Sequence, residues 1–241
     1  MQITVSPIPA LQDNYAWLLY EPASGFTAVV DPPEVEPIVK ALQQCGGRLD
    51  CILLTHHHAD HIGGAEALAA QFGARIVGAR KDRHRLPRLD EAVAEGDAVR
   101  LGPMTARVLE TPGHTRGHIA YYVPEAKALF CGDTLFSLGC GRLFEGTAEE
   151  MFDSLQKLAA LPEDTLVCCG HEYTASNARF ALSVDAENAA LKSRVAEVER
   201  LRAAGLPTVP SRLAEERAAN PFLRAPDAVA FARLRTKKDK F

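Results

Sequence analysis

Metal-binding side chains are crowded into one short segment of the sequence. Residues 55–61 read Thr-His-His-His-Ala-Asp-His, directly after the apolar run at 51–54. A turn at the tip of a strand can aim alternate side chains into one cavity while the sheet holds the backbone in place. His56 and His58 can then face one metal ion, and Asp60 and His61 can face a second ion beside it. Taken alone, the segment is also compatible with a solvated polar loop.

Three more candidates stand at the ends of apolar or β-prone runs, and each directly follows a glycine. They are His114, Asp133 and His171. Glycine permits the sharp turn and close backbone approach that a crowded site demands. Any one of them is more typical of an ordinary turn, but the seven side chains together supply five imidazoles and two carboxylates. That set is sufficient for two divalent ions, and zinc, iron or manganese would suit it, with zinc the expected metal.

The chain also alternates apolar runs with amphipathic stretches. Expected strands cover residues 16–20, 27–30, 51–54, 106–109, 118–123 and 166–168, and expected helices cover 37–44, 65–72, 147–160, 176–182 and 188–204. Thr147 and Glu150 have the spacing of a capping box. No further strand run is recognised after residue 173, and prolines divide the last third into short helices and loops. The pattern predicts an α/β layered sandwich followed by a helical appendage.

Composition narrows the class of protein. The 241 residues carry a net charge of −4, which offers no attraction to nucleic acid or to anionic membranes. No apolar run is long enough to span a bilayer, and the start of the chain lacks the pattern of a signal peptide. The six cysteines form no CxxC pair and are expected to be buried free thiols. We therefore expect a cytoplasmic monomer that binds neither nucleic acid nor membrane.

The His-His-His-Ala-Asp-His run and the later Gly-His, Gly-Asp and Gly-His pairs resemble the signature of the metallo-β-lactamase superfamily over residues 1–172. The resemblance implies an αββα sandwich followed by a small helical domain at 173–241. It implies one ion on His56, His58 and His114, and a second ion on Asp60, His61 and His171. Asp133 would bridge the two ions, and Asp60 and Asp133 would be the catalytic carboxylates.

Two other polar residues are candidates for a supporting role behind the ligands. Asp31 matches a buried carboxylate of the superfamily, although a helix cap or a turn explains it equally well. His118 begins an expected strand and is a candidate for orienting a ligand. His57 falls between ligands and is expected to point away from the ions, and His84 lies in a charged stretch and is expected to be exposed.

Further segments resemble glyoxalase II, a family within that superfamily. They are residues 139–147, 170–174, 220–224 and 235–241. The resemblance implies hydrolysis of the thioester S-D-lactoylglutathione to D-lactate and glutathione by a hydroxide shared between the metals, the second step of methylglyoxal detoxification. Arg235 and Lys238 would bind the glycine carboxylate of glutathione. Tyr173 and Arg142 would contact its peptide backbone, and Phe144 would pack against it.

The chain departs from the glyoxalase II pattern at two positions, because better-known members have Lys and Tyr where Arg142 and Phe144 stand. A persulfide dioxygenase with a single iron is the closest alternative, but the helical extension with its basic end argues against it. An RNA-processing nuclease would need an inserted domain and a basic surface, and the sequence indicates neither. A non-catalytic, metal-stabilised binding module would favour four closed ligands and thiolates, which this set lacks.

Overall fold

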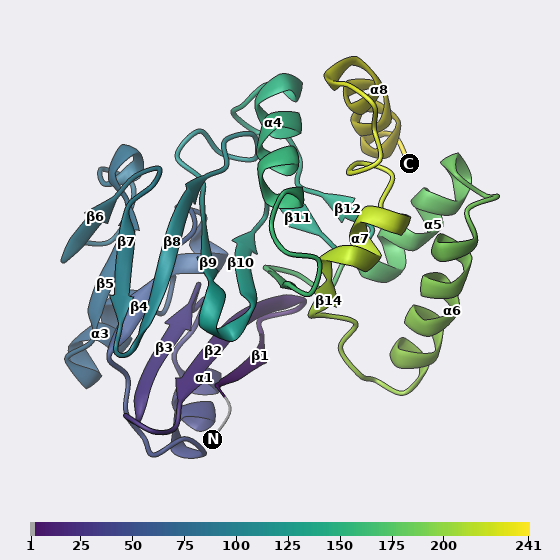
Figure 1. Cartoon of the computed structure of the whole chain (residues 1–241). Helices are drawn as coiled ribbons and strands as arrows, with labels where there is room; N and C mark the ends of the chain where they lie inside the picture. Colours follow the sequence, from purple (N-terminus) through teal and green to yellow (C-terminus); the bar gives the residue numbers. More distant parts are fainter. Residues whose placement is uncertain (1–2) are drawn as a thin grey trace. The chain divides into compact units, whose positions relative to one another are not determined.

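A computed structural model describes residues 3–241 and divides the chain into two compact units. The first unit contains Met1–Glu110 and Gly117–Gly132, and the second contains Thr111–Arg116 and Asp133–Phe241. Figure 1 shows the helices and strands with their labels. The functional division expected between residues 172 and 173 stays a prediction. Residues 1 and 2 of that expected first domain lie outside the described part.

The first six strands form one mixed sheet in chain order (Figure 1). They are β1 (Thr4–Ala10), β2 (Asn14–Glu21), β3 (Phe26–Val30), β4 (Cys51–Leu53), β5 (Arg75–Ala79) and β6 (Glu91–Val93). The first three strands pair antiparallel, whereas β3 through β6 pair in parallel. Parallel neighbours need crossover connections, which here contain α1 (Glu36–Gln43), α2 (Ala59–Ile62), α3 (Ala65–Phe72) and the 3-10 turn Arg80–Asp82. All three residues of β4 are buried, as a central parallel strand requires.

The same unit contains an antiparallel run of four strands in the order β10-β9-β8-β7. These are β7 (Ala98–Leu101), β8 (Met104–Glu110), β9 (Ile119–Val123) and β10 (Ala128–Gly132), with the 3-10 turn Pro124–Ala126 between the last two. Every residue of β9 and β10 is buried. The rings of Trp17 and Phe130 lie 6.5 Å apart, which joins β2 to β10 through the core of the unit.

The second unit is mainly helical. Its helices are α4 (Ala148–Ala159), α5 (Thr174–Val184), α6 (Ala189–Ala203), α7 (Leu213–Ala219) and α8 (Ala228–Asp239). A hairpin of β11 (Leu135–Phe136) and β12 (Gly139–Cys140) precedes them, and β13 (Leu166–Cys169) pairs antiparallel with β14 (Ser211–Arg212). The ring of Phe222 stacks on Phe180 and meets the edge of Phe231, at 5.8 Å in both cases, so three separate segments share one aromatic core.

The expected strands and the longer expected helices are confirmed to within two or three residues. The capping box is confirmed as well, since Thr147 Oγ1 accepts from the Glu150 amide at 3.1 Å and the Glu150 carboxylate accepts from the Thr147 amide at 2.7 Å. The expectation of no strand after residue 173 is wrong, because β14 follows the prolines at 207 and 210. Two residues paired with a distant strand leave no periodic pattern in a sequence. Over residues 3–241, no helix is both long and apolar enough to cross a membrane.

Candidate metal centre

The loop after β4 carries four of the seven expected ligands, all in the first unit. His56 is fully buried and His61 is almost so. His56 Nε2 lies 3.1 Å from His58 Nδ1, and His61 Nε2 lies 3.8 Å from Asp60 Oδ2. The loop therefore presents two neighbouring pairs of donor atoms, one made of two imidazoles and one made of an imidazole and a carboxylate.

Hydrogen bonds behind this loop determine which ring nitrogens face inward. Asp31 Oδ2 accepts from Thr55 Oγ1 at 2.6 Å and lies 3.0 Å from His61 Nδ1, while Thr55 Oγ1 lies 3.0 Å from His56 Nδ1. Because Thr55 donates its only hydroxyl proton to Asp31, it accepts from His56 Nδ1–H. Both histidines then carry their proton on Nδ1 and offer the lone pair of Nε2, which is the arrangement that a metal ligand needs.

Three expected ligands lie close together in the second unit. Asp133 Oδ2 is 3.5 Å from His114 Nε2 and 3.3 Å from His171 Nε2. His114 Nδ1 is 2.9 Å from the carbonyl oxygen of Arg142, to which it donates, so its Nε2 also offers a lone pair. All three residues are buried. One carboxylate oxygen between two imidazole nitrogens has the geometry of a group that two ions can share.

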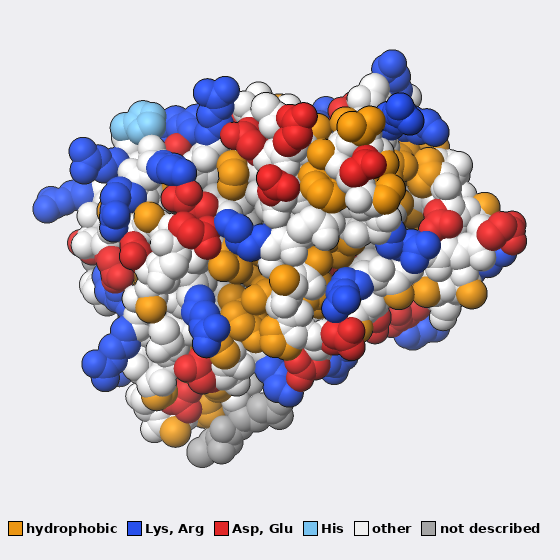
Figure 2. All heavy atoms as spheres, turned by 45° about the horizontal axis from the view of Figure 1, so that its top comes forward, with side chains coloured by type: hydrophobic (Ala, Val, Ile, Leu, Met, Phe, Trp, Pro, Cys, Tyr) orange, Lys and Arg blue, Asp and Glu red, His pale blue; other side chains and the backbone are white. Residues whose placement is uncertain are grey.

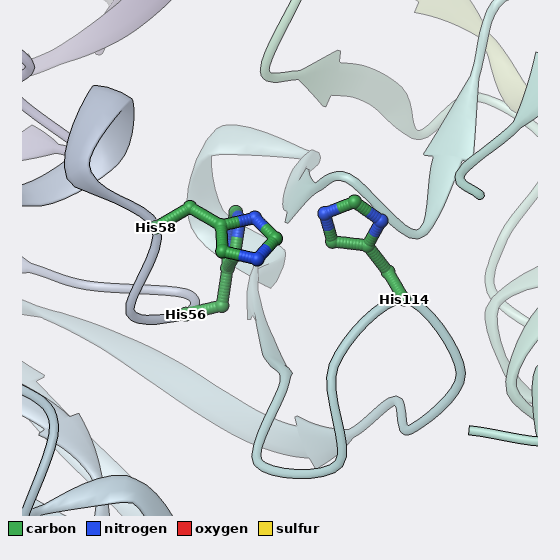
Figure 3. A group of neighbouring side chains, drawn as sticks. All are labelled: His56, His58 and His114. Carbon is green, nitrogen blue, oxygen red and sulfur yellow. The ribbon is translucent and has the colours of Figure 1, made fainter. Parts of the chain in front are cut away.

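Within each unit the ligand atoms lie close together. His56 and His58, with nitrogens 3.1 Å apart, belong to the first unit, and His114, drawn with them in Figure 3, belongs to the second. In the second unit, Asp133 Oδ2 lies within 3.5 Å of both His114 and His171. Imidazole nitrogens and carboxylate oxygens suit divalent transition metals, so the donor set fits such ions.

Asp31 also lies within 4.8 Å of His56 and His61, but its contacts indicate a supporting role. Oδ1 accepts from the Thr55 amide at 2.8 Å, and Oδ2 is engaged with Thr55 and His61. The residue has φ of +49°, a conformation that costs energy for a side chain other than glycine and that clusters at functional sites. Asp31 is therefore placed to orient His61 from behind.

The remaining histidines lie in three different environments. His118 is fully buried, and its ring stacks on that of His56 with 4.8 Å between centroids. His57 Nδ1 lies 2.9 Å from Asp82 Oδ2, and His84 is exposed. Gly132, at the end of β10, has φ of +45°, and a Cβ there would lie 2.3 Å from Thr55 Oγ1. The glycine before Asp133 is thus required by close packing.

Two aromatic side chains beside the ligands of the second unit are exposed. Phe144 is 63% exposed and meets the His114 ring edge-on at 5.1 Å. Tyr173 is 37% exposed and stacks on the His171 ring, with 4.6 Å between centroids and 4° between planes. Exposed aromatic rings next to buried ligands provide a surface on which an organic substrate can pack.

The three expected cations of the second unit differ in exposure. The Arg142 side chain is 66% exposed, with Nε 4.0 Å from Asp239 Oδ1. Lys238 Nζ lies 5.2 Å from the centre of the Phe180 ring and 3.4 Å from the carbonyl oxygen of Ser176. Burial and the neighbouring arginines lower the pKa of Lys238 to about 8. Arg235 is only 4% exposed and donates to the Cys140 carbonyl at 2.9 Å, so its observed contacts hold the chain itself.

Sequence patterns missed two residues that hold the loop after β4. Asn14 is buried, and its Nδ2 donates to the Asp60 carbonyl at 2.9 Å and to Asp60 Oδ2 at 3.1 Å. Thr55 connects Asp31 to His56, as described above. Asn14 precedes the strand expected at 16–20, where an Asn is typical of a turn, so no sequence pattern pointed to the first contact.

The buried cysteines offer no reactive thiolate. Burial raises the pKa of Cys51 and Cys169 to about 12 and of Cys140 to about 11, and it raises the pKa of Cys168 well above its ordinary value. The Arg235 guanidinium beside Cys140 opposes this rise without cancelling it. None of these four thiols is therefore activated as a nucleophile.

Comparisons with known proteins agree with this geometry. Residues 13–171 match the model of the metallo-beta-lactamase superfamily, to which the chain belongs. A solved structure described as ETHE1 from Myxococcus xanthus aligns with 98% of this chain and 90% of its own, at 26% identity and a TM-score of 0.72. The expected fold class, an αββα sandwich with a C-terminal helical region, is confirmed by these matches.

Within that superfamily the family can be stated more closely. Residues 172–241 match the model described as the hydroxyacylglutathione hydrolase C-terminus. A protein of that name from Acidiphilium cryptum is 59% identical, covering 99% of this chain and 97% of its own length, and one from Ruegeria pomeroyi is 52% identical over the whole of both chains. The chain belongs to the hydroxyacylglutathione hydrolase family, as its resemblance to glyoxalase II indicated.

Proposed function

We propose that this protein hydrolyses S-D-lactoylglutathione and related 2-hydroxyacyl thioesters of glutathione to the free 2-hydroxy acid and glutathione. The observation that carries the proposal is full-length similarity to relatives named for this activity, in a chain that retains every expected metal ligand. In this reaction water adds to the carbonyl carbon, the carbon–sulfur bond breaks, and the thiolate leaves and takes up a proton.

Two divalent ions are part of the proposal, with zinc expected and iron or manganese compatible with the same donors. His56, His58 and His114 would hold one ion, Asp60, His61 and His171 the other, and Asp133 both. When bound, the ions would lower the pKa of a shared water to about 7 and polarise the thioester carbonyl. Asp31 and Thr55 keep the Nδ1 protons of His61 and His56 turned away from the ions.

The leaving group of this reaction needs little assistance from the protein. A thiol has an ordinary pKa of about 8.5, so the thiolate departs readily and needs no dedicated acid. Asp60 and Asp133, the two carboxylates among the ligands, complete the catalytic set that we propose. Burial raises the pKa of Cys140 and Cys169, which argues against either thiol as the nucleophile.

Glutathione would bind through the exposed groups of the second unit. Phe144 would pack against the peptide, Tyr173 and Arg142 would contact its backbone, and Lys238 would attract its glycine carboxylate together with Arg235. Arg235 would contribute positive charge from its buried position, where Asp239 lies 3.0 Å away. Phe144 lacks the hydroxyl that a tyrosine would offer, so this contact is one of packing alone.

The alternatives differ in what they require. The comparisons do not favour a persulfide dioxygenase or a non-catalytic module, because full-length relatives at 52–59% identity are named hydroxyacylglutathione hydrolase.

We further propose that the protein is a cytoplasmic monomer without a nucleic-acid partner. Figure 2 shows one face on which basic side chains stand among acidic and apolar ones, in keeping with the net charge of −4.

The test compares two thioesters of D-lactate, one with glutathione and one with the uncharged thiol N-acetylcysteamine. Both present the same carbonyl to the metal centre, whereas only the first can use the cationic residues. We expect a higher kcat/KM for the glutathione thioester, mainly through a lower KM. Equal kcat/KM for both would refute glutathione recognition, and no hydrolysis of either by metal-loaded protein would refute the proposed reaction.

A further inference from the structure

The short hairpin of β11 and β12 belongs to the same unit as helices that come much later in the chain (Figure 1), and side chains from that part of the chain hold it. Asn220 Nδ2 donates to the carbonyl oxygens of Phe136 and Gly139, both at 3.0 Å. The Leu138 amide donates to Glu216 Oε2 at 2.8 Å. Three further contacts hold the hairpin: Asn177 Nδ2 donates to Ser137 O at 3.0 Å, Arg194 Nη2 to Ser137 Oγ at 3.4 Å, and Arg235 Nη1 to Cys140 O at 2.9 Å.

These hydrogen bonds are buried, so the loss of one would leave a polar group without a partner away from water. Asn220 is fully buried and Glu216 is 1% exposed. Glu216 Oε1 has no hydrogen-bond partner among the described residues, so a carboxylate is kept inside the unit at a cost. Leu138, at the turn, has φ of +57°, a strained conformation that persists only when the surroundings enforce it. The helices therefore impose a defined position on the hairpin.

Both ends of the hairpin lead to expected metal ligands. Asp133 stands two residues before β11, and Arg142 follows β12 with a carbonyl that accepts from His114 Nδ1. The Gly141 amide donates to Thr134 O at 3.2 Å, and a Cβ on Gly141 would lie 1.9 Å from the Asp133 carbonyl oxygen. The two ends are thus packed directly against each other, and a shift of the hairpin would move Asp133 and His114 together.

We propose that Glu216 and Asn220 are positioning residues for the metal centre, acting through the hairpin on Asp133 and His114. The C-terminal helices then do more than contact substrate, because they also determine how tightly metal is held. This inference rests on the ligand assignment of the proposed function. Residues that orient ligands typically change metal affinity or activity by about 10–100-fold when altered.

Glu216→Leu is the main test, since leucine fills the same space without an acceptor for the Leu138 amide. We expect metal affinity, measured by chelator competition, to fall at least about 10-fold. We expect kcat to fall with it while KM changes less than about twofold, because no substrate contact is removed. In the metal-free protein, hydrogen exchange at the Leu138 amide should become faster.

Two further variants separate positioning from general destabilisation. In Glu216→Gln the amide oxygen can still accept from the Leu138 amide and from Asn220 Nδ2, which donates to Glu216 Oε2 at 3.1 Å, so we expect metal affinity to stay near the wild-type value. Glu187→Leu makes the same chemical change at a side chain that is 97% exposed, and should leave affinity and kcat unchanged. If Glu216→Leu fails to fold, Asn177→Ala removes one contact to the hairpin and is expected to lower affinity in the same direction.

Wild-type metal affinity in Glu216→Leu, or in Asn177→Ala if that variant has to be used, would overturn the inference. So would a Glu216→Gln variant as impaired as Glu216→Leu. Metal binding is measured without substrate, so the two proposals fail separately: the proposed function is refuted if metal-loaded wild-type protein hydrolyses no glutathione thioester, whatever the metal affinities of the variants.

Discussion

Asp133 Oδ2 lies 3.5 Å from His114 Nε2 and 3.3 Å from His171 Nε2, and in the proposed assignment these two histidines bind different ions. Removing this carboxylate should therefore affect both ions. We expect Asp133→Ala to weaken binding of the two ions together and to lower kcat by more than about 100-fold, the upper range for residues that merely support ligands. Metal analysis and turnover on one sample check this, and two retained ions with unchanged turnover would contradict it.

Asp31 permits a finer test at the same scale, because asparagine tolerates its positive φ almost as well. In Asp31→Asn an amide group replaces one carboxylate oxygen, so Thr55 and His61 compete for fewer acceptors. We expect metal affinity or kcat to fall by about 10–100-fold with little loss of folded protein. Chelator competition and a thermal melt of the metal-free protein measure the two effects, and unchanged metal affinity would argue against the orienting role.

Helix α8 is the element on which substrate recognition is most directly tested. Lys238 loses its charge as pH rises through about 8, because burial and nearby arginines lower its pKa. Its attraction for glutathione is present below that pH and is lost above it. We expect KM to rise between pH 7 and 9 toward the value of Lys238→Ala, with kcat affected less.

Variants of neighbouring residues provide the controls for this pH dependence. Lys238→Ala should raise KM about 10-fold or more at pH 7, since a hydrogen bond to a charged group is worth about 1.5–3 kcal/mol. Lys238→Arg should keep a low KM at pH 9, and Lys237→Ala, a change at an exposed neighbour, should leave KM unchanged. A change in kcat alone would contradict a binding role for Lys238.

Among the helices and strands, sequence patterns predicted the features that neighbouring residues determine. The apolar run before His56, the glycines before His114, Asp133 and His171, and the Thr147 capping box were all recognisable, because neighbouring residues determine them. The hydrogen bonds of Glu216 and Asn220 to the hairpin could not be recognised in the sequence. The one to the Leu138 amide joins residues 78 apart, and those to the carbonyls of Gly139 and Phe136 join residues 81 and 84 apart. Pairing over such distances depends on packing that no short pattern contains.

Across the whole chain, a metal-activated water in the role of nucleophile leaves turnover independent of the cysteine thiols. A thiol with a pKa of about 11, such as Cys140, is ionised about once in 10⁴ at pH 7. We expect iodoacetamide at neutral pH to leave turnover unchanged, even though Cys45 is partly exposed and can react. Stoichiometric labelling that abolishes turnover of fully metal-loaded protein would show that a thiol takes part.

The most direct test of the central claim is a metal titration of the metal-free protein, with S-D-lactoylglutathione hydrolysis and bound metal measured on the same samples. Thioester cleavage should be absent without metal, rise as ions bind and reach its plateau at two ions per chain. Full cleavage by metal-free protein, or two bound ions with no cleavage, would contradict the account.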